Sequence, residues 1–330
     1  MNSWYDGLGG RWQNLRERWG LDEQGLLLPA LFLLFVVVQL GLAWSWSREP
    51  RAFPVNKPGA VPGLLLARTL ADVSATLTQK PGGYLRNDLM PPGVALDNIS
   101  AWELGVLRQV RDMSRVMHQD LGLSPRLVED ADLADAYAAF SSDENAWAFP
   151  STESELKRGT ASVRSYADRL TAGRDARFLV RDAYLVQWLS AVEGDLDSLS
   201  ARLNAALPDH PVLAGRSTVG MRPLEPTSWW RVDNVFYESR GSAWALLHLL
   251  KAVEIDFGSQ LAERQALLSL RAAIHELEAT QQALWSPVVL NGSGFGVFAN
   301  HSLVMANYLN RARTDLADVR MLLQAVPQSE

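Results

Sequence analysis

Four segments of the chain carry apolar residues at alternating steps of four and three positions, the spacing of a helix that buries one face. The apolar positions are Leu185, Leu189, Val192, Leu196, Leu199 and Leu203; Leu246, Leu250, Val253 and Phe257; Leu267, Leu270, Ile274, Leu277 and Leu284; and Met305, Leu309, Ala312, Leu316, Val319 and Leu323. No segment holds this period beyond about four heptads. We therefore predict long helices that pack nearly parallel or antiparallel in an intramolecular bundle, rather than a free coiled coil.

Further helices are predicted in the first half of the chain. One runs over 64–78, and another opens at Ser100, which with Glu103 resembles a capping box. The apolar face of this second helix is formed by Trp102, Val106, Val110, Met113 and Met117. Shorter helices are expected over 130–140 and from Pro150 onward, where acidic residues suit the first turn. No convincing run of strand alternation appears, so we predict an all-α fold.

The segment from Gly25 to Trp44 (GLLLPALFLLFVVVQLGLAW) has no charge and one clearly polar side chain, Gln39. At about 1.5 Å per residue, such a run spans a hydrocarbon core of about 30 Å. A helix buried in a soluble domain shows a polar stripe, which this run lacks. We therefore predict one transmembrane helix over 25–46, after a short N-terminal segment over 1–24.

The alternative for this segment is a cleaved signal peptide, because Gly41-Leu42-Ala43 has the small-x-small form of a peptidase site. The stretch before the apolar run is long and contains four acids, which favours an uncleaved anchor. Three basic residues lie on each side of the run, so the positive-inside rule gives no orientation.

Composition changes between the apolar run and the predicted bundle. Residues 47–63 are rich in proline and poor in apolar periodicity, which predicts an extended tether. The remainder, 64–330, is expected to form the helical bundle. Proline, glycine and arginine interrupt the helical pattern near 207–228, and this break either divides two subdomains or holds a short hairpin.

Charge and cysteine content exclude several classes of function. The net charge is −6 and there is no block of Lys and Arg, so we expect no binding to nucleic acid. The chain has no cysteine, which excludes disulfides and thiolate metal sites.

Motifs that would carry chemistry are incomplete. No histidine has a glutamate three positions before it, and the His-Glu-x-x-His pattern is absent. Ser154 and Lys157 match Ser-x-x-Lys, but the companion motifs of penicillin-interacting enzymes do not occur. His248 and His275 lie on predicted long helices, where we expect half-buried histidines with backbone or carboxylate partners. We assign no catalytic residue, no metal site and no cofactor.

Three stretches carry residues that favour interaction surfaces. Trp, Tyr and Arg favour protein interfaces when exposed and belong to the core when buried, and the sequence leaves both interpretations open. A glycine-rich link before the last helix offers backbone amides to an anion, although it lacks the Lys-Ser/Thr of a phosphate loop. The candidate interaction residues are Tyr84, Asn87 and Asp88; Trp229, Trp230 and Arg231; and Gly292, Gly294 and Gly296.

Several stretches have a specific pattern beyond helical periodicity. They are GGYLRNDLMPPG (82–93), DNISAWELGVLRQVRD (97–112), EDADL (129–133), WAFPSTE (147–153), WWRVDNVFYESRGSAWALLHLLKAVEIDF (229–257) and NGSGFGVFANHSLVMANY (291–308). Together they resemble DUF2333, a family of uncharacterised bacterial membrane proteins, over nearly the whole chain after residue 40. The resemblance implies a Gram-negative inner-membrane protein with a cytoplasmic N-terminus and a periplasmic main domain. It implies no activity and transfers no catalytic residue.

Three hypotheses about function follow. The first and favoured one is a non-enzymatic scaffold or interaction protein, held at the lipid bilayer by residues 25–46, that binds an envelope protein. The second is a binding module for an envelope lipid or small molecule in a pocket between helices. The third is a hydrolase or metalloprotein, which needs Asp88, Glu129, Asp130, Asp132, His248 and His275 to converge. An exposed heptad face would also allow a homo-oligomer.

Overall fold

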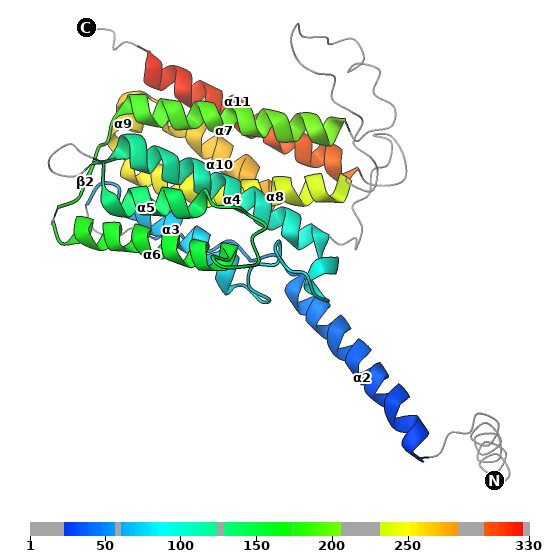
Figure 1. Cartoon of the computed structure of the whole chain (residues 1–330). Coiled ribbons are helices and arrows are strands. Elements are labelled where there is room, and N and C mark those ends of the chain that lie inside the picture. Colours follow the sequence, from blue (N-terminus) through cyan, green and yellow to red (C-terminus); the bar gives the residue numbers. More distant parts are fainter. Residues whose placement is uncertain are drawn as a thin grey trace, which may run out of the picture.

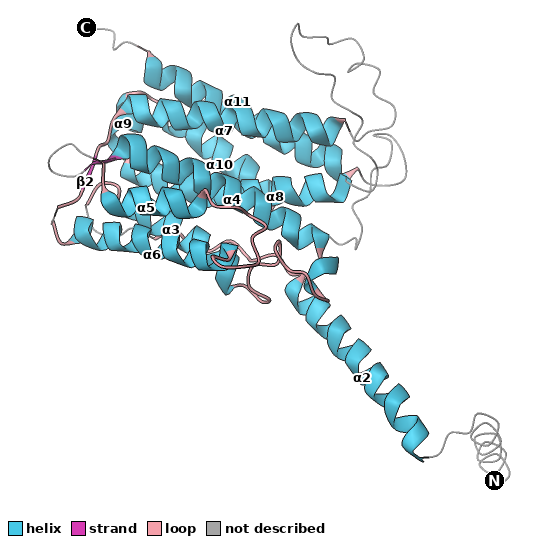
Figure 2. Ribbon diagram, viewed as in Figure 1, coloured by secondary structure: helices cyan, strands magenta, loops and turns pink. Residues whose placement is uncertain are grey.

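A computed structural model describes residues 23–56, 61–123, 129–173, 175–205, 232–282 and 300–325. Helices account for most of these residues (Figure 2). The α-helices are α2 (Glu23–Trp46), α3 (Leu64–Gln79), α4 (Asp97–Val116), α5 (Ala131–Phe140), α6 (Thr152–Thr171), α7 (Asp182–Asn204), α8 (Val232–Asp256), α9 (Gly258–Glu263), α10 (Leu267–Thr280) and α11 (His301–Gln324). The shorter elements are a 3-10 turn (Gly93–Ala95), a π-helix (Met117–Leu121) and the strands β1 (Gly122–Leu123) and β2 (Arg177–Phe178). The prediction of an all-α fold is confirmed.

The bundle helices run side by side in three layers, and α2 leaves one end of the bundle (Figure 1). The middle layer consists of α4 and α8, which pack against each other over most of their length. On one side α3 and α5 pack against α6, and on the other side α11 packs against α7 and α10. The antiparallel pair β1–β2 joins Gly122 to Phe178 at the end of the bundle away from α2.

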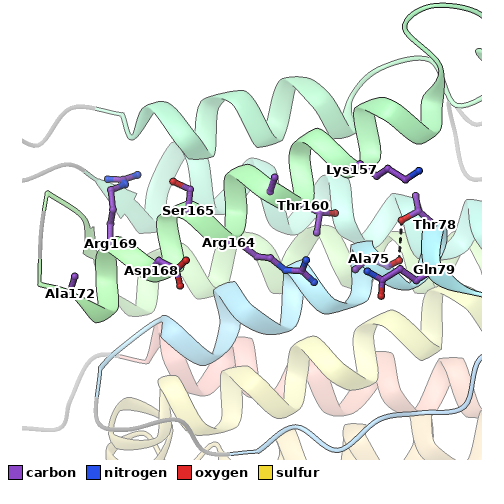
Figure 3. Close-up of a pocket in the computed structure, with 11 residues that line it drawn as sticks. Ala75, Thr78, Gln79, Lys157, Thr160, Arg164, Ser165, Asp168, Arg169 and Ala172 are labelled. Carbon is purple, nitrogen blue, oxygen red and sulfur yellow. Dashed lines mark hydrogen bonds between the residues drawn. The ribbon is translucent and has the colours of Figure 1, made fainter.

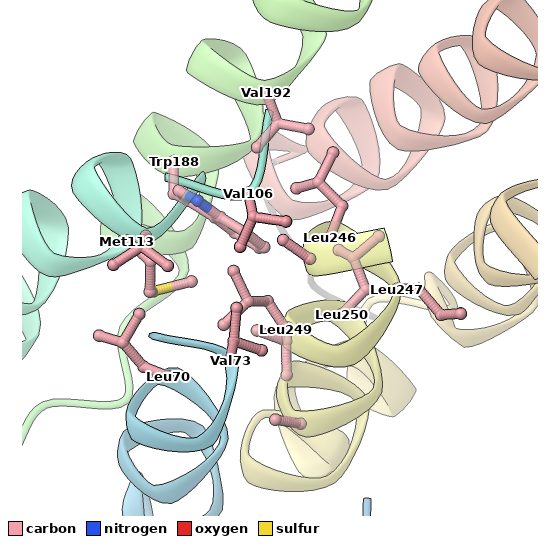
Figure 4. Close-up of a cluster of buried hydrophobic side chains, with 14 of the residues drawn as sticks. Leu70, Val73, Val106, Met113, Trp188, Val192, Leu246, Leu247, Leu249 and Leu250 are labelled. Atoms are coloured by element: carbon pink, nitrogen blue, oxygen red, sulfur yellow. The ribbon is translucent and has the colours of Figure 1, made fainter. Parts of the chain in front are cut away.

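The apolar positions that predict the long helices form the core. All six positions named for α7 and all six named for α11 are buried, whereas Leu284 lies outside the described residues. Figure 4 shows Val192 of α7 and Leu246 of α8 in one cluster with Leu70 of α3. Burial of each such side chain stabilises the fold by about 1.5–3 kcal/mol. The buried residues before and after the break near 207–228 belong to one cluster, although the break itself is not described.

The middle layer depends on two glycines where α4 crosses α8. A Cβ atom at Gly105 would lie 2.0 Å from the carbonyl oxygen of Glu238, and one at Gly241 would lie 2.0 Å from that of Trp102. These neighbours are backbone atoms, which cannot turn aside as a side chain can. The crossing therefore requires glycine on both helices.

The capping-box prediction at Ser100 is wrong. The helix α4 begins at Asp97, and the buried carboxylate of Glu103 accepts the backbone N–H groups of Leu85 (2.9 Å) and Arg86 (2.8 Å). The same carboxylate pairs with Lys80 at 2.7 Å. Glu103 thus holds the loop that enters α4, because that loop brings an ammonium and two amides to the carboxylate.

The helices α5 and α6 begin where the sequence predicts. Asp130 accepts the backbone N–H groups of Asp132 and Leu133 at the start of α5, and Ser151 accepts that of Ser154 at the start of α6. Such caps satisfy amides that have no partner within the helix.

Within the described part of the chain, one helix is long and apolar enough to cross a membrane. It covers Leu27–Trp46, and none of this window is buried inside the bundle. Pro29 lies in its early turns. The apolar side chains of α2 therefore face outward on all sides, as a lipid-facing helix requires.

Candidate interaction surface

The chain leaves α2 and lies along α8 over residues 47–56, which we call the strap. The Glu49 carboxylate pairs with the Arg240 guanidinium at 2.7 Å, and the arginine side chain is only 8 % exposed. Arg240 also donates to the backbone carbonyls of Thr280 and Gln282, each at 2.9 Å. One arginine of α8 therefore fixes both the strap and the C-terminal end of α10.

A buried histidine holds the middle of the strap. The backbone N–H of Phe53 donates to Nε2 of His248 at 3.0 Å, so Nδ1 carries the proton and donates to the carbonyl of Trp244 at 2.6 Å. The Phe53 ring stacks on the imidazole with centroids 3.9 Å apart. Burial lowers the pKa of His248 to about 4, so the ring is neutral near pH 7. The expected backbone partner of His248 is confirmed. The expected half-burial is wrong for both histidines, because His248 is fully buried and His275 on α10 is exposed.

Asp256, at the end of α8, binds the chain where it enters α3. Its carboxylate accepts the backbone N–H of Leu66 at 2.8 Å and also bonds those of Gly63 and Leu65. Burial raises the pKa of Asp256 to about 6, and these hydrogen bonds oppose the rise. A side chain of α8 thus caps the first turn of α3, whose own N-cap residue is a glycine.

The end of α2 contacts the bundle directly at a second place. A Cβ atom at Gly82 would lie 2.8 Å from the Trp46 ring, so the loop between α3 and α4 rests closely on that indole. Next to it, the guanidinium of Arg48 lies 3.7 Å over the ring of Trp44, which is 67 % exposed. Two independent contacts, through the strap and through this loop, therefore fix the bundle on the end of α2.

Three of the candidate interaction residues lie in the loop between α3 and α4, and two of them bond it to the loop between α5 and α6. Tyr84 is 1 % exposed, and its hydroxyl donates to the carbonyl of Glu144 at 3.0 Å. The Asn87 side chain donates to the carbonyl of Ala146 at 2.8 Å. Burial raises the pKa of Tyr84 far above its ordinary value and also raises that of Asp88, which is half-buried. Tyr84 and Asn87 hold the two loops together.

The other six candidate residues fall outside the described residues; they are Trp229, Trp230, Arg231, Gly292, Gly294 and Gly296. Sequence reasoning missed a set of exposed apolar side chains in the two loops, which we call the apolar loop tips. They are Leu89 (63 % exposed), Met90 (77 %), Val94 (57 %), Trp147 (67 %) and Phe149 (104 %). Their detectable feature is a Trp-Ala-Phe-Pro run inside a loop that is otherwise polar.

A groove with a volume of about 700 Å³ lies between α3 and α6 (Figure 3). Its lining includes the small side chains of Ala75 and Thr160 and the charged side chains of Lys157, Arg164 and Asp168. An acyl chain needs an enclosed apolar pocket, whereas this groove is open and has charged side chains along it. The groove therefore gives no support to the hypothesis of a lipid held between helices, which stays a prediction.

A network of charged residues joins α4, α7 and α8. The buried carboxylate of Glu238 pairs with the guanidinium groups of Arg108 and Arg202. Burial and the neighbouring Asp195 raise the pKa of Asp112 above its ordinary range. The cavity beside this network measures about 20 Å³, which holds about one water molecule and no organic substrate. The network is a structural link between the layers.

The residues required by the hydrolase or metalloprotein hypothesis do not converge. Asp130 and Asp132 both pair with Arg169, at 2.6 Å and 2.7 Å. His248 is occupied by the strap, and Asp88 lies in the loop beside α2. Among the described residues, no group of three or more His, Asp or Glu side chains is placed to hold a metal ion.

The match to a protein family covers α2, the strap, the loops and the bundle together. A family model described as "Uncharacterized protein conserved in bacteria (DUF2333)" matches residues 21–326. The chain belongs to the DUF2333 family. The resemblance found in the sequence is thus confirmed, and the DUF2333 unit includes α2 as well as the helices on which the strap and loops rest. No curated protein and no solved structure matches this DUF2333 chain.

Proposed function

We propose that this DUF2333 protein is a membrane-anchored interaction protein of the bacterial cell envelope, which presents its bundle to a protein partner in a fixed orientation. The observation that carries the proposal is the double join between α2 and the bundle. The strap is pinned by Glu49 and Phe53, and Trp46 packs on Gly82. A flexible tether suits a domain that searches for its target, whereas a fixed join suits one that holds a surface at a set height.

Residues 25–46 are the proposed span of the inner membrane, with the N-terminus in the cytoplasm and the bundle in the periplasm. The length and apolar character of α2 support the span, and the bacterial family supports the setting. Reporter fusions at the C-terminus and after Lys57, each active in one compartment only, test the orientation. Periplasmic activity of both fusions is expected, and cytoplasmic activity would overturn this placement.

The groove between α3 and α6 is the surface that we propose for the partner. The α3 end of the groove, at Thr78 and Gln79, leads directly into the loop that rests on Trp46. Small residues on the floor allow a helix or an extended segment to approach closely, and Arg164 and Asp168 at the rim give it polar specificity. A partner bound here would meet the bundle next to the membrane.

Photo-crosslinking in living cells tests this surface. A photoreactive amino acid is placed at Arg164 or Ser165 in the groove, and at the exposed residues Leu268 and Arg271 of α10 as controls. A discrete adduct with a second protein is expected at the groove positions only. The mass of the adduct separates an envelope partner from a second copy of this chain. Absence of any adduct at the groove, or equal adducts at the controls, would contradict the proposal.

A further inference from the structure

Large apolar side chains are exposed next to the end of the anchor. In the loop between α5 and α6, the four consecutive residues 147–150 are all exposed, and Phe149 is 104 % exposed. In the loop between α3 and α4, Leu89 and Met90 are 63 % and 77 % exposed. Exposed apolar side chains that occur singly are common, whereas a cluster of five at one place indicates a binding surface.

The two loops that carry these side chains are fixed to each other. Besides the hydrogen bonds of Tyr84 and Asn87, the guanidinium of Arg86 pairs with the Glu144 carboxylate at 3.2 Å. Arg111 on α4 pairs with the same carboxylate at 2.6 Å, which ties both loop bases to the bundle. The polar residues thus lie at the bases of the loops and the apolar residues lie at their tips.

The position of the loops relative to α2 is set by Trp46. This residue ends the apolar stretch of α2, and the loop between α3 and α4 packs on its ring at Gly82. Figure 2 shows both loops gathered where α2 meets the bundle. Tryptophan and arginine at the end of a membrane helix favour the headgroup region, and Trp44, Trp46 and Arg48 occupy this end. The loops therefore begin at the depth of the lipid headgroups.

We infer that the apolar loop tips insert into the outer part of the same bilayer that α2 spans, so that the bundle rests on the lipid surface. The inference rests on the proposed membrane anchoring. Aromatic and aliphatic side chains with polar residues behind them match the gradient from acyl chains to headgroups. A protein partner at this place would have to bind within the headgroup layer, and for this reason the observations favour lipid.

Single cysteines test this inference cleanly, because the chain has no native cysteine. The full chain is reconstituted in nanodiscs of phosphatidylethanolamine and phosphatidylglycerol with one protein per disc. A nitroxide label is attached at position 90 or 149, in M90C or F149C. The matched control is L268C, since Leu268 is equally apolar and 80 % exposed, but lies at the start of α10, whereas Arg240 joins the other end of α10 to the strap. The variant L33C, in the middle of α2, reports on the anchor.

Collision of each label with oxygen and with a water-soluble nickel chelate is measured by electron paramagnetic resonance. The labels at 90 and 149 are expected to be at least about threefold less accessible to nickel than the label at 268, because lipid excludes the chelate. Equal nickel access at 90, 149 and 268, with L33C protected, would overturn the inference and leave the anchor standing. Nickel access at L33C as well would show that the anchoring itself is wrong.

A second measurement separates lipid from protein as the cause of protection. Discs that hold two copies are compared with discs that hold one, and protection that appears only with two copies would identify a self-contact and overturn the inference. In the background of W147E and F149E, the label at 90 is expected to shift toward the value of the control at 268, because charged tips are expelled from lipid. An unchanged value at 90 would contradict insertion.

Discussion

His248 joins two segments of the chain that are 195 positions apart in sequence. Its two ring nitrogens have fixed and opposite roles, since Nε2 accepts from Phe53 and Nδ1 donates to Trp244. A protonated ring has no acceptor left for the Phe53 amide. Proton uptake at this residue therefore opposes the docking of the strap.

The variant H248Q tests this role through its dependence on pH. The histidine has its pKa lowered to about 4 in the fold, so the unfolded chain binds the proton first between about pH 6.5 and 4. As the pH falls through that window, the wild type is expected to lose up to about 3 kcal/mol of the free energy of unfolding that neutral His248 contributes. Glutamine does not titrate, so the stability difference between the two proteins should shrink from pH 7.5 to pH 5. Urea unfolding in detergent, followed by circular dichroism, measures it.

The difference between the two proteins is informative because other groups titrate in the same window. Burial raises the pKa of Asp256 to about 6, so the folded protein binds this proton before the unfolded chain does. The contribution of Asp256 to the free energy of unfolding therefore increases as the pH falls, opposite to that of His248. This contribution is common to both proteins and cancels. A difference that stays constant with pH would contradict the role of neutral His248.

Two glycines in helix interiors give a matched pair of substitutions. The variant G105A should lower the free energy of unfolding by about 1–3 kcal/mol, because its Cβ would clash with the backbone of α8. The variant G194A on α7 has no atom within 4 Å of its Cβ, and should raise it by about 0.5–1 kcal/mol. Urea unfolding of the full chain in detergent measures both. Equal effects at both positions would mean that α4 and α8 do not approach closely at Gly105.

The strap is an element whose backbone form was predictable and whose partners were not. Its prolines and its lack of apolar period indicate an extended segment, and residues 47–56 contain no helix. The partners Arg240 and His248 lie nearly two hundred positions away on α8, which also carries other charged residues such as Glu238. No local pattern identifies such a contact.

The variant F53A is expected to release the strap from α8, because it removes the ring that stacks on His248 and packs edge-on against Trp244. Trypsin should then cleave after Arg48 or Arg51 several-fold faster, since a loosened backbone enters the protease more often. Mass spectrometry of timed digests measures the rate. The control N56A changes an exposed residue of the same segment and should leave the rate unchanged. Equal cleavage of F53A and wild type would mean that this ring does not hold the strap.

At the scale of the whole molecule, the sequence predicts the helices well and the surfaces poorly. Heptad positions determine which side of α7 and α11 is buried, because burial follows helical periodicity directly. The crossing glycines, the ion pairs of Glu103 and Glu238 and the apolar loop tips depend on residues that are distant in sequence. Tyr84 illustrates the limit, since its type suits a surface or a core equally and only the fold places it in the core.

A rigid join predicts a narrow distribution of distances between the anchor and the bundle. Spin labels at Leu40 of α2 and Leu268 of α10, both exposed, report it in nanodiscs by double electron–electron resonance. A single narrow peak is expected for the wild type. The double variant E49A and F53A removes both contacts of the strap, and should broaden the peak. A broad distribution in the wild type would contradict the fixed orientation.

The long reach of the strap has a consequence for biosynthesis. The bonds from Glu49 to Arg240, from Phe53 to His248 and from Leu66 to Asp256 each join partners about 190 positions apart. As the ribosome delivers the chain from its N-terminus, α2 and the strap emerge long before α8 exists to receive them. Loop-closure entropy must be overcome before these contacts form, so their formation is a late event. A product that ends before Asp256 leaves the first bundle helix uncapped, and cellular proteases can recognise it as unfinished.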